Sequence, residues 1–372
     1  MLPFTRPSIG EEEQRAVAEV LASGWLATGP RVAAFEQALA DYLGGGVTVR
    51  VFNSGTSALE AALIASGIGP GDEVIIPAMS FVATANVVVR AGAVPVFVDV
   101  DPVSRNLSVN TVETALTTQT RAIMPVHFAG RGVEMGPLRE LARERGLLVI
   151  EDAAQAVGTR IDDTPVGASG NPVCFSFHPN KNMTTIEGGA LACNDSGLIR
   201  RAERIRFHGI ERDAEGVMDV LDWGGKMNMP DVNAAVGLVQ LTRLERFNQR
   251  RRELALGYIE KLPRHPAMTL PVDVPGHSWH MFCVCVDFKA LGTNRSAFQD
   301  RLRSLGVGTG VHYPAMHLYS HYRKFGYEPG DLPAAERIGE QTLTLPLFPA
   351  MTGDDLGRVC GAFEQLLGGG AS

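Results

Sequence analysis

A single lysine lies in a polar segment between two short apolar runs of the chain. The runs, residues 173–177 and 190–193, each have the length and composition of a buried strand. A hairpin would need only a few connecting residues, so the segment around Lys181 is either a plain solvated loop or a site. Burial would lower the pKa of Lys181, and its neutral amine could then form a Schiff base with an aldehyde or ketone.

An anion site is predicted where strand 47–52 meets helix 57–66. The turn reads Asn-Ser-Gly-Thr-Ser, and its free amides and helix dipole would attract an anion, with Thr56 and Ser57 as further donors. Serine and threonine are also ordinary helix N-caps, so the turn alone leaves both interpretations open. Ser176, placed ahead of Lys181, could reach the same anion.

Three further side chains follow predicted strands. Asp152 and Gln155 come directly after strand 147–150. Asp152 could accept a hydrogen bond from a protonated ring nitrogen and Gln155 could bond a ring substituent, or the pair could simply begin a helix. Phe81, shortly after strand 73–76, could stack on an aromatic ring or belong to the core.

These groups would meet at one edge of a parallel sheet, where the carboxyl ends of strands gather. Together they give an anion seat, a ring stacker, a carboxylate for a ring nitrogen and a lysine for an aldehyde. Pyridoxal 5′-phosphate needs all four, because its ring acts as an electron sink only with an acidic partner. The sequence therefore predicts a site for this cofactor.

The predicted elements that position the site alternate between strand and helix from residue 47 to residue 150. This alternation predicts an α/β fold with a mostly parallel sheet between helices. A long helix is expected over 231–261, and a strand over 306–311 in a region of α+β character. We expect a large domain (1–245) and a smaller C-terminal domain (246–372), with 209–225 as a mobile loop.

Composition excludes several classes of protein. The 372 residues carry a net charge of −7 without a basic block, which disfavours nucleic-acid binding. No apolar run reaches the roughly 18 residues of a membrane span, and the N-terminus lacks the apolar region of a signal peptide. Five scattered cysteines are expected to be reduced in a cytoplasmic protein. The histidines lack the partner pattern of a metal site.

The chain resembles the DegT/DnrJ-type sugar aminotransferases, fold-type I pyridoxal-phosphate enzymes that act on nucleotide-linked keto sugars. The resemblance runs nearly end to end. The matching segments are Gly-Trp at 24–25, Thr-Gly-Pro at 28–30, Phe-Glu at 35–36, Ser-Gly-Thr-Ser-Ala-Leu at 54–59, Gly-Pro-Gly-Asp-Glu-Val-Ile at 69–75, Glu-Asp-Ala-Ala-Gln-Ala at 151–156, Ser-Phe-His at 176–178, Lys-Asn at 181–182 and Leu-Pro-Leu-Phe-Pro at 345–349.

The resemblance implies a role for each candidate residue. Lys181 would hold the cofactor as a Schiff base and later move protons. Asp152 would pair with the pyridine nitrogen, Gln155 with the ring oxygen, and Phe81 would stack on the ring. The phosphate would be bound by Thr56, Ser57 and Ser176, and the sugar nucleotide would lie near Thr28, His312, Tyr313 and His317.

One segment resembles a particular branch of the family. Lys226 and Asn228 stand where many members have Asn-x-Arg, as in the branch that contains UDP-4-amino-4-deoxy-L-arabinose aminotransferase. In that branch the asparagine reaches the phosphate of the neighbouring subunit, which implies a homodimer with shared active sites. Asn228 could also cap the long helix.

The expected activity is transfer of an amino group from glutamate, which leaves 2-oxoglutarate, to a nucleotide-linked keto sugar such as a UDP-4-keto sugar. Such chemistry belongs to amino sugar biosynthesis, in lipopolysaccharide modification or secondary metabolism. A keto-cyclitol or 3-keto sugar aminotransferase and a non-catalytic regulator of the same fold remain alternatives. A dehydrogenase is disfavoured because segment 53–58 lacks Gly-x-Gly-x-x-Gly, and relatives that act as dehydratases carry histidine in place of Lys181.

Overall fold

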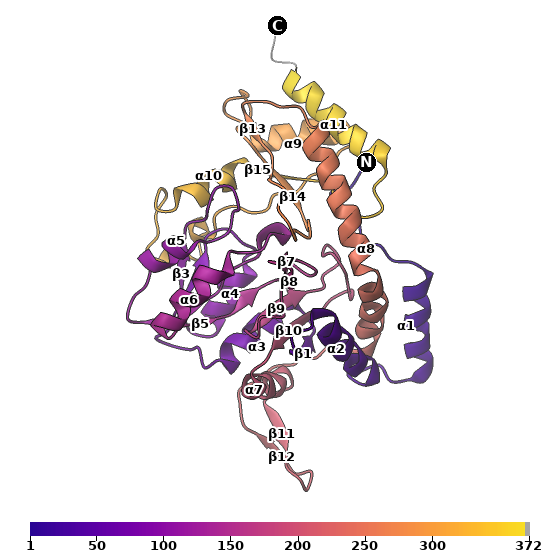
Figure 1. Ribbon diagram of the computed structural model, residues 1–372, viewed down its shortest axis with the longest axis vertical. Coiled ribbons are helices and arrows are strands. Elements are labelled where there is room, and N and C mark those ends of the chain that lie inside the picture. The colour runs from indigo at the N-terminus through magenta and orange to yellow at the C-terminus, as the bar shows by residue number, and fades with distance from the viewer. Residues whose placement is uncertain (369–372) are drawn as a thin grey trace.

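The structure is a computed structural model that describes residues 1–368, and a mixed sheet lies at its centre (Figure 1). Its strands are β1 (Thr48–Phe52), β2 (Glu73–Pro77), β3 (Val94–Val98), β4 (Thr120–Ile123), β5 (Leu148–Val149), β6 (Glu151–Asp152), β9 (Val173–Ser176) and β10 (Gly189–Cys193). Only Ile150 separates β5 from β6, so the two act as one strand. The order across the sheet is therefore β3-β2-β4-β5/β6-β9-β10-β1.

Every strand of this sheet except β10 runs in the same direction. The pairings from β3 to β9 are parallel, whereas β10 is antiparallel to both β9 and β1. The predicted parallel sheet is thus confirmed with one exception. Parallel neighbours need a long crossover, but β10 follows β9 through the loop 177–188 alone and must return antiparallel. That loop carries Lys181.

Helices cover both faces of the sheet. One face packs against α3 (Gly55–Ala65), α4 (Ala83–Arg90) and α7 (Ser196–Arg206). The other packs against α2 (Pro30–Leu43), α5 (Val109–Thr114), α6 (Met135–Arg145) and the first part of α8. Val74 and Ile76 enter the first layer and Ile75 the second, because successive side chains point to opposite faces. Burial on both faces explains the solidly apolar strands.

A single helix, α8 (Asp231–Lys261), runs from beside α1 (Glu11–Ser23) to the C-terminal region (Figure 1). There β13 (Met268–Thr269), β14 (Phe282–Val286) and β15 (Thr342–Leu345) form an antiparallel sheet, with α9 (Arg295–Ser304) and α11 (Gly353–Gly368) nearby. The expected domain boundary after residue 245 falls inside α8. The N-terminal Leu2 pairs with Val307 and joins the C-terminal core, so the division at 245 stays a prediction, and its last four residues lie outside the described chain.

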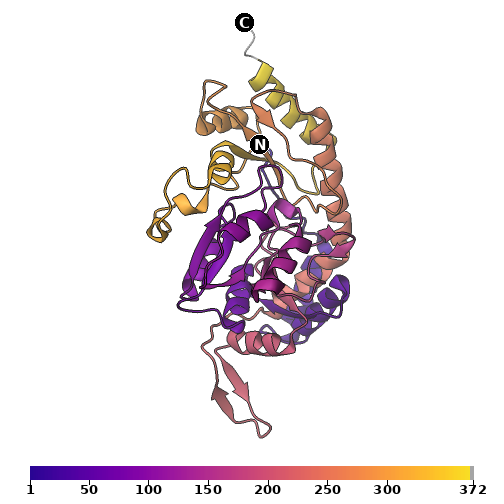
Figure 2. The ribbon, with the colours of Figure 1, turned by 60° about the vertical axis from the view of Figure 1, so that its left-hand side comes forward.

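Two expectations about single segments were wrong. The predicted loop 209–225 contains a hairpin of β11 (Ile210–Arg212) and β12 (Met218–Val220) that projects from the body (Figure 2). The predicted strand 306–311 is irregular, with isolated bridges at Val307 and Gly310. Two elements had not been predicted, α10 (Pro333–Gln341) and the small hairpin of β7 (Arg160–Ile161) and β8 (Thr164–Pro165). Within residues 1–368, no helix has the length and apolar content to cross a membrane.

Candidate active site

Lys181 projects from the loop between β9 and β10 into a cavity of about 390 Å³. Internal hydrogen bonds hold the loop, since Thr184 Oγ1 donates to the carbonyl of Phe177 (2.9 Å). Asn182 Nδ2 ties it to Asn248 Oδ1 (2.7 Å) and to the carbonyl of Ser278 (2.8 Å). Burial lowers the pKa of Lys181 to about 8, against the opposing influence of the Asp152 carboxylate. A substantial fraction of this amine is therefore neutral near pH 7.5.

The cavity brings together most of the predicted site residues. It opens at the carboxyl ends of the parallel strands, where α/β sheets place their ligands. The predicted residues that line it are Thr56, Phe81, Asp152, Gln155, Ser176, Lys181, His312 and Tyr313. Ser57, Thr28, Asn228 and His317 do not line it.

Asp152 is buried at the floor of the cavity, where both carboxylate oxygens already accept hydrogen bonds. Thr84 Oγ1 donates to Oδ2 (2.7 Å) and the backbone N–H of Ala154 to Oδ1 (3.0 Å). Burial raises the pKa of Asp152, while these donors and the nearby Lys181 oppose the rise. The two donors fix the carboxylate as an acceptor facing the cavity. Sequence reasoning missed Thr84, whose only signal is its place three residues after Phe81.

The amide of Gln155 has a defined orientation. Its Oε1 accepts a hydrogen bond from the backbone N–H of Ala129 (2.8 Å). Since the oxygen is engaged in the wall, the Nε2 group is the part left to donate into the cavity. This arrangement suits a partner that accepts hydrogen bonds, such as a ring oxygen.

The N-terminus of α3 forms an anion seat beside β9 and β10. Ser54 caps the helix by accepting the N–H of Ser57 (3.1 Å), and Ser57 Oγ donates to Asn53 Oδ1 (2.7 Å). The Ser57 hydroxyl is thus committed to the turn, while Thr56 and Ser176 face the cavity. A Cβ on Gly189 would lie 2.5 Å from the nitrogen of Gly55, so glycine is required where the strand and the helix N-terminus meet.

Aromatic side chains also line the cavity. Phe81 is 54% exposed, and its ring centroid lies 6.0 Å from that of Tyr313. His312 Nδ1 lies 2.7 Å from Thr344 Oγ1, and burial with the nearby Lys181 charge lowers the pKa of His312 to about 4. His312 is therefore neutral at physiological pH. Phe81 is available to stack on a flat ring.

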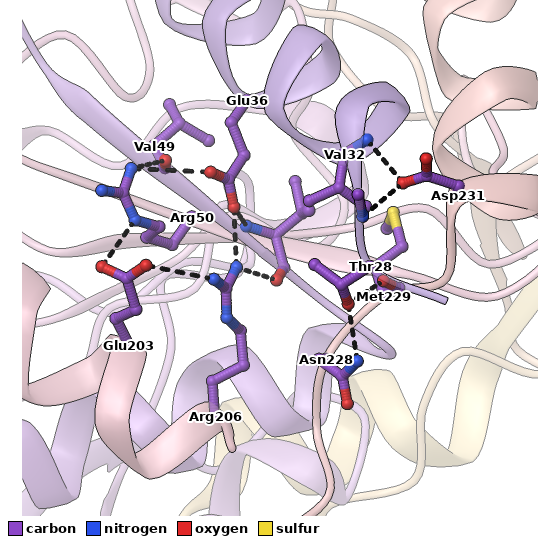
Figure 3. Close-up of polar contacts among 12 residues, drawn as sticks. Thr28, Val32, Glu36, Val49, Arg50, Glu203, Arg206, Asn228, Met229 and Asp231 are labelled. Atoms are coloured by element: carbon purple, nitrogen blue, oxygen red, sulfur yellow. Dashed lines mark hydrogen bonds and ion pairs between the residues drawn. The ribbon is translucent and has the colours of Figure 1, made fainter. Parts of the chain in front are cut away.

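Two predicted site residues, Thr28 and Asn228, lie together outside the lining of the cavity (Figure 3). Asn228 Nδ2 donates to Thr28 Oγ1 (2.6 Å), which in turn donates to the carbonyl of Met229 (2.7 Å). Asn228 Oδ1 is buried without a hydrogen-bond partner in the described chain. Asn228 does not cap α8, which begins after Pro230 with no side-chain cap. Asp231 instead binds the amides at the start of α2.

His317 is a core residue in this structure. It is 0% exposed, and its Nε2 lies 3.1 Å from Glu336 Oε1 on α10. Its ring packs near Phe97 and Tyr327. The structure therefore places His317 away from the cavity wall that holds His312 and Tyr313.

The cavity fits pyridoxal phosphate on the chemistry of its donors. The α3 seat suits a phosphate, Phe81 a ring face, Asp152 a protonated ring nitrogen, Gln155 a ring oxygen and Lys181 an aldehyde. Among residues 1–368, no group of three or more potential ligands is placed to hold a metal ion.

Comparison with known proteins agrees with this geometry. Residues 7–364 match the model of the DegT/DnrJ/EryC1/StrS aminotransferase family. The aminotransferase TlmJ from Streptoalloteichus hindustanus is 36% identical, with 99% of each chain covered and a TM-score of 0.91. PseC from Helicobacter pylori, an aminotransferase involved in pseudoaminic acid biosynthesis, is 28% identical over 99% of each chain, with a TM-score of 0.92.

A putative sugar aminotransferase from Streptococcus pneumoniae, Spr1654 in its PMP form, is also similar. It is 28% identical over 99% of each chain, with a TM-score of 0.92. The fold is that of the fold-type I transferases, and the cofactor of this chain is pyridoxal phosphate. The chain belongs to the DegT/DnrJ/EryC1/StrS aminotransferase family.

Proposed function

We propose that this aminotransferase moves an amino group from glutamate to a nucleotide-linked keto sugar, with a UDP-4-keto sugar as the first candidate. The observation that carries the proposal is the placement of Lys181 and Asp152 in one cavity, with an anion seat and an exposed aromatic ring beside them. The sugar substrate is supported by the solved structures described as sugar aminotransferases. The UDP and 4-keto details rest on the Lys226-x-Asn228 motif.

Each of these cavity residues has its own role in the proposed reaction. When bound, pyridoxal phosphate supplies a ring that accepts the electron pair released at the carbon bearing the amino group. Asp152 keeps a proton on the ring nitrogen by accepting its hydrogen bond. Lys181 Nζ would hold the cofactor through its aldehyde and, as a free amine, would carry a proton between the carbon that bears the amino group and the aldehyde carbon of the cofactor. The seat at Thr56 and Ser176 anchors the phosphate, so the ring stays in register with Lys181.

The same proposal includes a homodimer whose subunits share active sites. Asn228 does not line its own subunit's cavity, and its buried Oδ1 has no hydrogen-bond partner among residues 1–368. The projecting hairpin and the segment after it carry large apolar side chains that are each more than half exposed. They are Val217, Met218, Val220, Leu221 and Trp223. Such a cluster on a projecting element favours contact with a second copy. A cytoplasmic location and a role in amino sugar biosynthesis, including lipopolysaccharide modification, belong to this proposal.

An absorbance titration tests the first half of the reaction. The purified protein loaded with pyridoxal phosphate is expected to show the visible band of the lysine-bound cofactor, and L-glutamate should bleach it. Lys181→Ala should lack that band. A Lys181→Ala variant with the wild-type band would contradict the assignment of Lys181.

A substrate panel tests the second half. Glutamate-reduced enzyme is mixed with UDP- and dTDP-linked 4-keto sugars, 3-keto sugars and a keto-cyclitol, and return of the visible band is followed. Fastest return with a UDP-4-keto sugar supports the proposal. Fastest return with a keto-cyclitol or a 3-keto sugar would move the assignment to one of the two alternatives.

A further inference from the structure

A buried histidine–glutamate pair lies next to Asp152, and the chemistry above does not use it. His127 is 0% exposed and Glu151 is 1% exposed. His127 Nδ1 accepts a hydrogen bond from the N–H of Val133 (3.0 Å). The neutral ring therefore carries its proton on Nε2 and donates it to Glu151 Oε2 (3.1 Å).

Glu151 is an ionised anchor for this histidine. Burial alone would raise the pKa of Glu151, but the hydrogen bond from His127 and the charge and hydrogen bond of Arg139 lower it below its ordinary value. Arg139 Nη2, Ser169 Oγ and Asn171 Nδ2 all lie within 3.3 Å of its Oε1. A carboxylate with this many donors holds its position, so it also holds the His127 ring.

The His127 ring closes segment 127–133 into a loop with Ala129 near its tip. The ring binds Val133 at one end, and the backbone N–H of His127 donates to the carbonyl of Asp152 (3.1 Å) at the other. Ala129 has a φ of 55°, a left-handed conformation that is unfavourable for a residue with a Cβ and must be held by its surroundings. The N–H of Ala129 is the group that engages the Gln155 oxygen.

We propose that His127 is a positioning residue for the cofactor site. By tying Val133 to Glu151, it holds Ala129 where its N–H occupies the oxygen of Gln155, so that Gln155 presents its NH₂ group to the cofactor's ring oxygen. With the loop released, the Gln155 amide can turn and present its oxygen, which would repel the ring oxygen. This inference rests on the proposed role of Gln155.

A double-mutant cycle on the full chain tests the coupling. The dissociation constant of pyridoxal phosphate and the absorption maximum of the bound cofactor are measured for wild type, His127→Leu, Gln155→Ala and the double variant. Each single change is expected to weaken cofactor binding about tenfold and to shift the maximum, since each removes one oriented hydrogen bond. The double variant should bind the cofactor about as tightly as the single variant with the lower affinity, because the two residues act through one contact. Additive losses of about a hundredfold would overturn the inference.

Three variants separate positioning from general stability. His127→Asn keeps an acceptor for Val133 and His127→Gln keeps a donor for Glu151, but neither ties the two together, so both should show the shifted spectrum. These two decide the question if His127→Leu does not fold. His317→Leu is the matched control, since His317 is an equally buried histidine bound to a glutamate. It should lower stability without changing the spectrum.

The outcomes distinguish this inference from the proposal beneath it. If Gln155→Ala changes neither the dissociation constant nor the spectrum, the proposed role of Gln155 fails. If Gln155→Ala changes both while His127→Leu and His127→Gln change neither, only the role of His127 fails.

Discussion

At the scale of the residue, we expect the hydroxyl of Thr84 to influence the acid limit of the proposed reaction through Asp152. Burial raises the pKa of Asp152, and the bond from Thr84 lowers it. The reaction needs the ionised carboxylate, so the rate falls as the pH drops through this pKa. Thr84→Val removes a donor that favours the charged form and should move the acid limb of kcat to higher pH by about one unit. The pH profile of kcat measures this shift. Thr84→Ser keeps the hydroxyl and should therefore leave the acid limb at its wild-type position. An unmoved acid limb in Thr84→Val would show that Asp152 does not set that limb.

The pKa of Lys181 makes a second prediction at this scale. Only the neutral amine attacks the aldehyde, and burial lowers the pKa of Lys181 to about 8. The rate at which cofactor-free protein captures pyridoxal phosphate should therefore rise about tenfold per pH unit below pH 8 and level off above it. Asp152→Asn removes a carboxylate that raises this pKa, so the plateau should begin at lower pH. Stopped-flow absorbance measures the rate, and a rise continuing to pH 10 would mean that Lys181 has an ordinary pKa.

Most residues that line the cavity were predicted from the sequence, whereas those that hold them in place were not. Lys181, Asp152 and Gln155 stand next to recognisable strands, and the rule that parallel strands end together predicts that they meet. Thr84, Ala129 and His127 act through contacts between segments that are distant in sequence. The commitment of the Ser57 hydroxyl to Asn53 was equally hidden, because a capping serine and a phosphate-binding serine look the same in sequence.

At the scale of the element, the junction of β10 with α3 carries the anion seat. Gly189→Ala would bring a Cβ to within 2.5 Å of backbone atoms of Ser54 and Gly55, so the helix N-terminus must move. We expect the affinity for pyridoxal phosphate to fall about tenfold or more, since oriented amides bind phosphate only in register. Inorganic phosphate should also compete less well with the cofactor in this variant.

Gly357→Ala in α11 is the control for this change. Apart from its neighbours in the helix, no atom of residues 1–368 lies within 4 Å of a Cβ at that position, and alanine there should raise stability by about 0.5–1 kcal/mol without altering cofactor affinity. Calorimetry gives the affinity and thermal unfolding gives the stability of each variant. If the two variants bind pyridoxal phosphate with equal affinity, the junction of β10 with α3 does not contribute to the cofactor site.

The elements that were predicted wrongly have two different physical causes. The hairpin of β11 and β12 lies in a segment rich in glycine and aspartate, which read as a loop because its strands are short and exposed on both faces. The segment 306–311 has the composition of a strand, but at Val307 and Gly310 it makes only isolated bridges, to Leu2 and Thr344. The segment 306–311 thus depends on distant partners, and the hairpin depends on the pairing of two short exposed strands. The long helix expected from Asp231 to about Lys261, in contrast, matches α8.

At the scale of the whole molecule, the projecting hairpin should control assembly. Val220→Asp places a charge among the exposed apolar side chains of this segment and should weaken the proposed dimer at least a hundredfold, since a buried unpaired charge costs several kcal/mol. Val272→Asp changes a similarly exposed valine outside the hairpin and should leave the dimer intact. Light scattering over a concentration series measures both. A monomer at all concentrations in the wild type would contradict the proposed dimer itself.

Subunit mixing tests whether the active sites are shared. If the amide of Asn228 completes the neighbouring subunit's phosphate seat, Lys181→Ala and Asn228→Ala should each be nearly inactive alone. Mixing them under conditions of subunit exchange would create heterodimers with one site that keeps both Lys181 and Asn228, and a second site that lacks both. Activity should then reappear, approaching one quarter of wild type at equal mixing, because about half of the dimers are mixed and each has one intact site of two. If Asn228 instead serves the cavity of its own chain, every site lacks one group and mixing restores nothing.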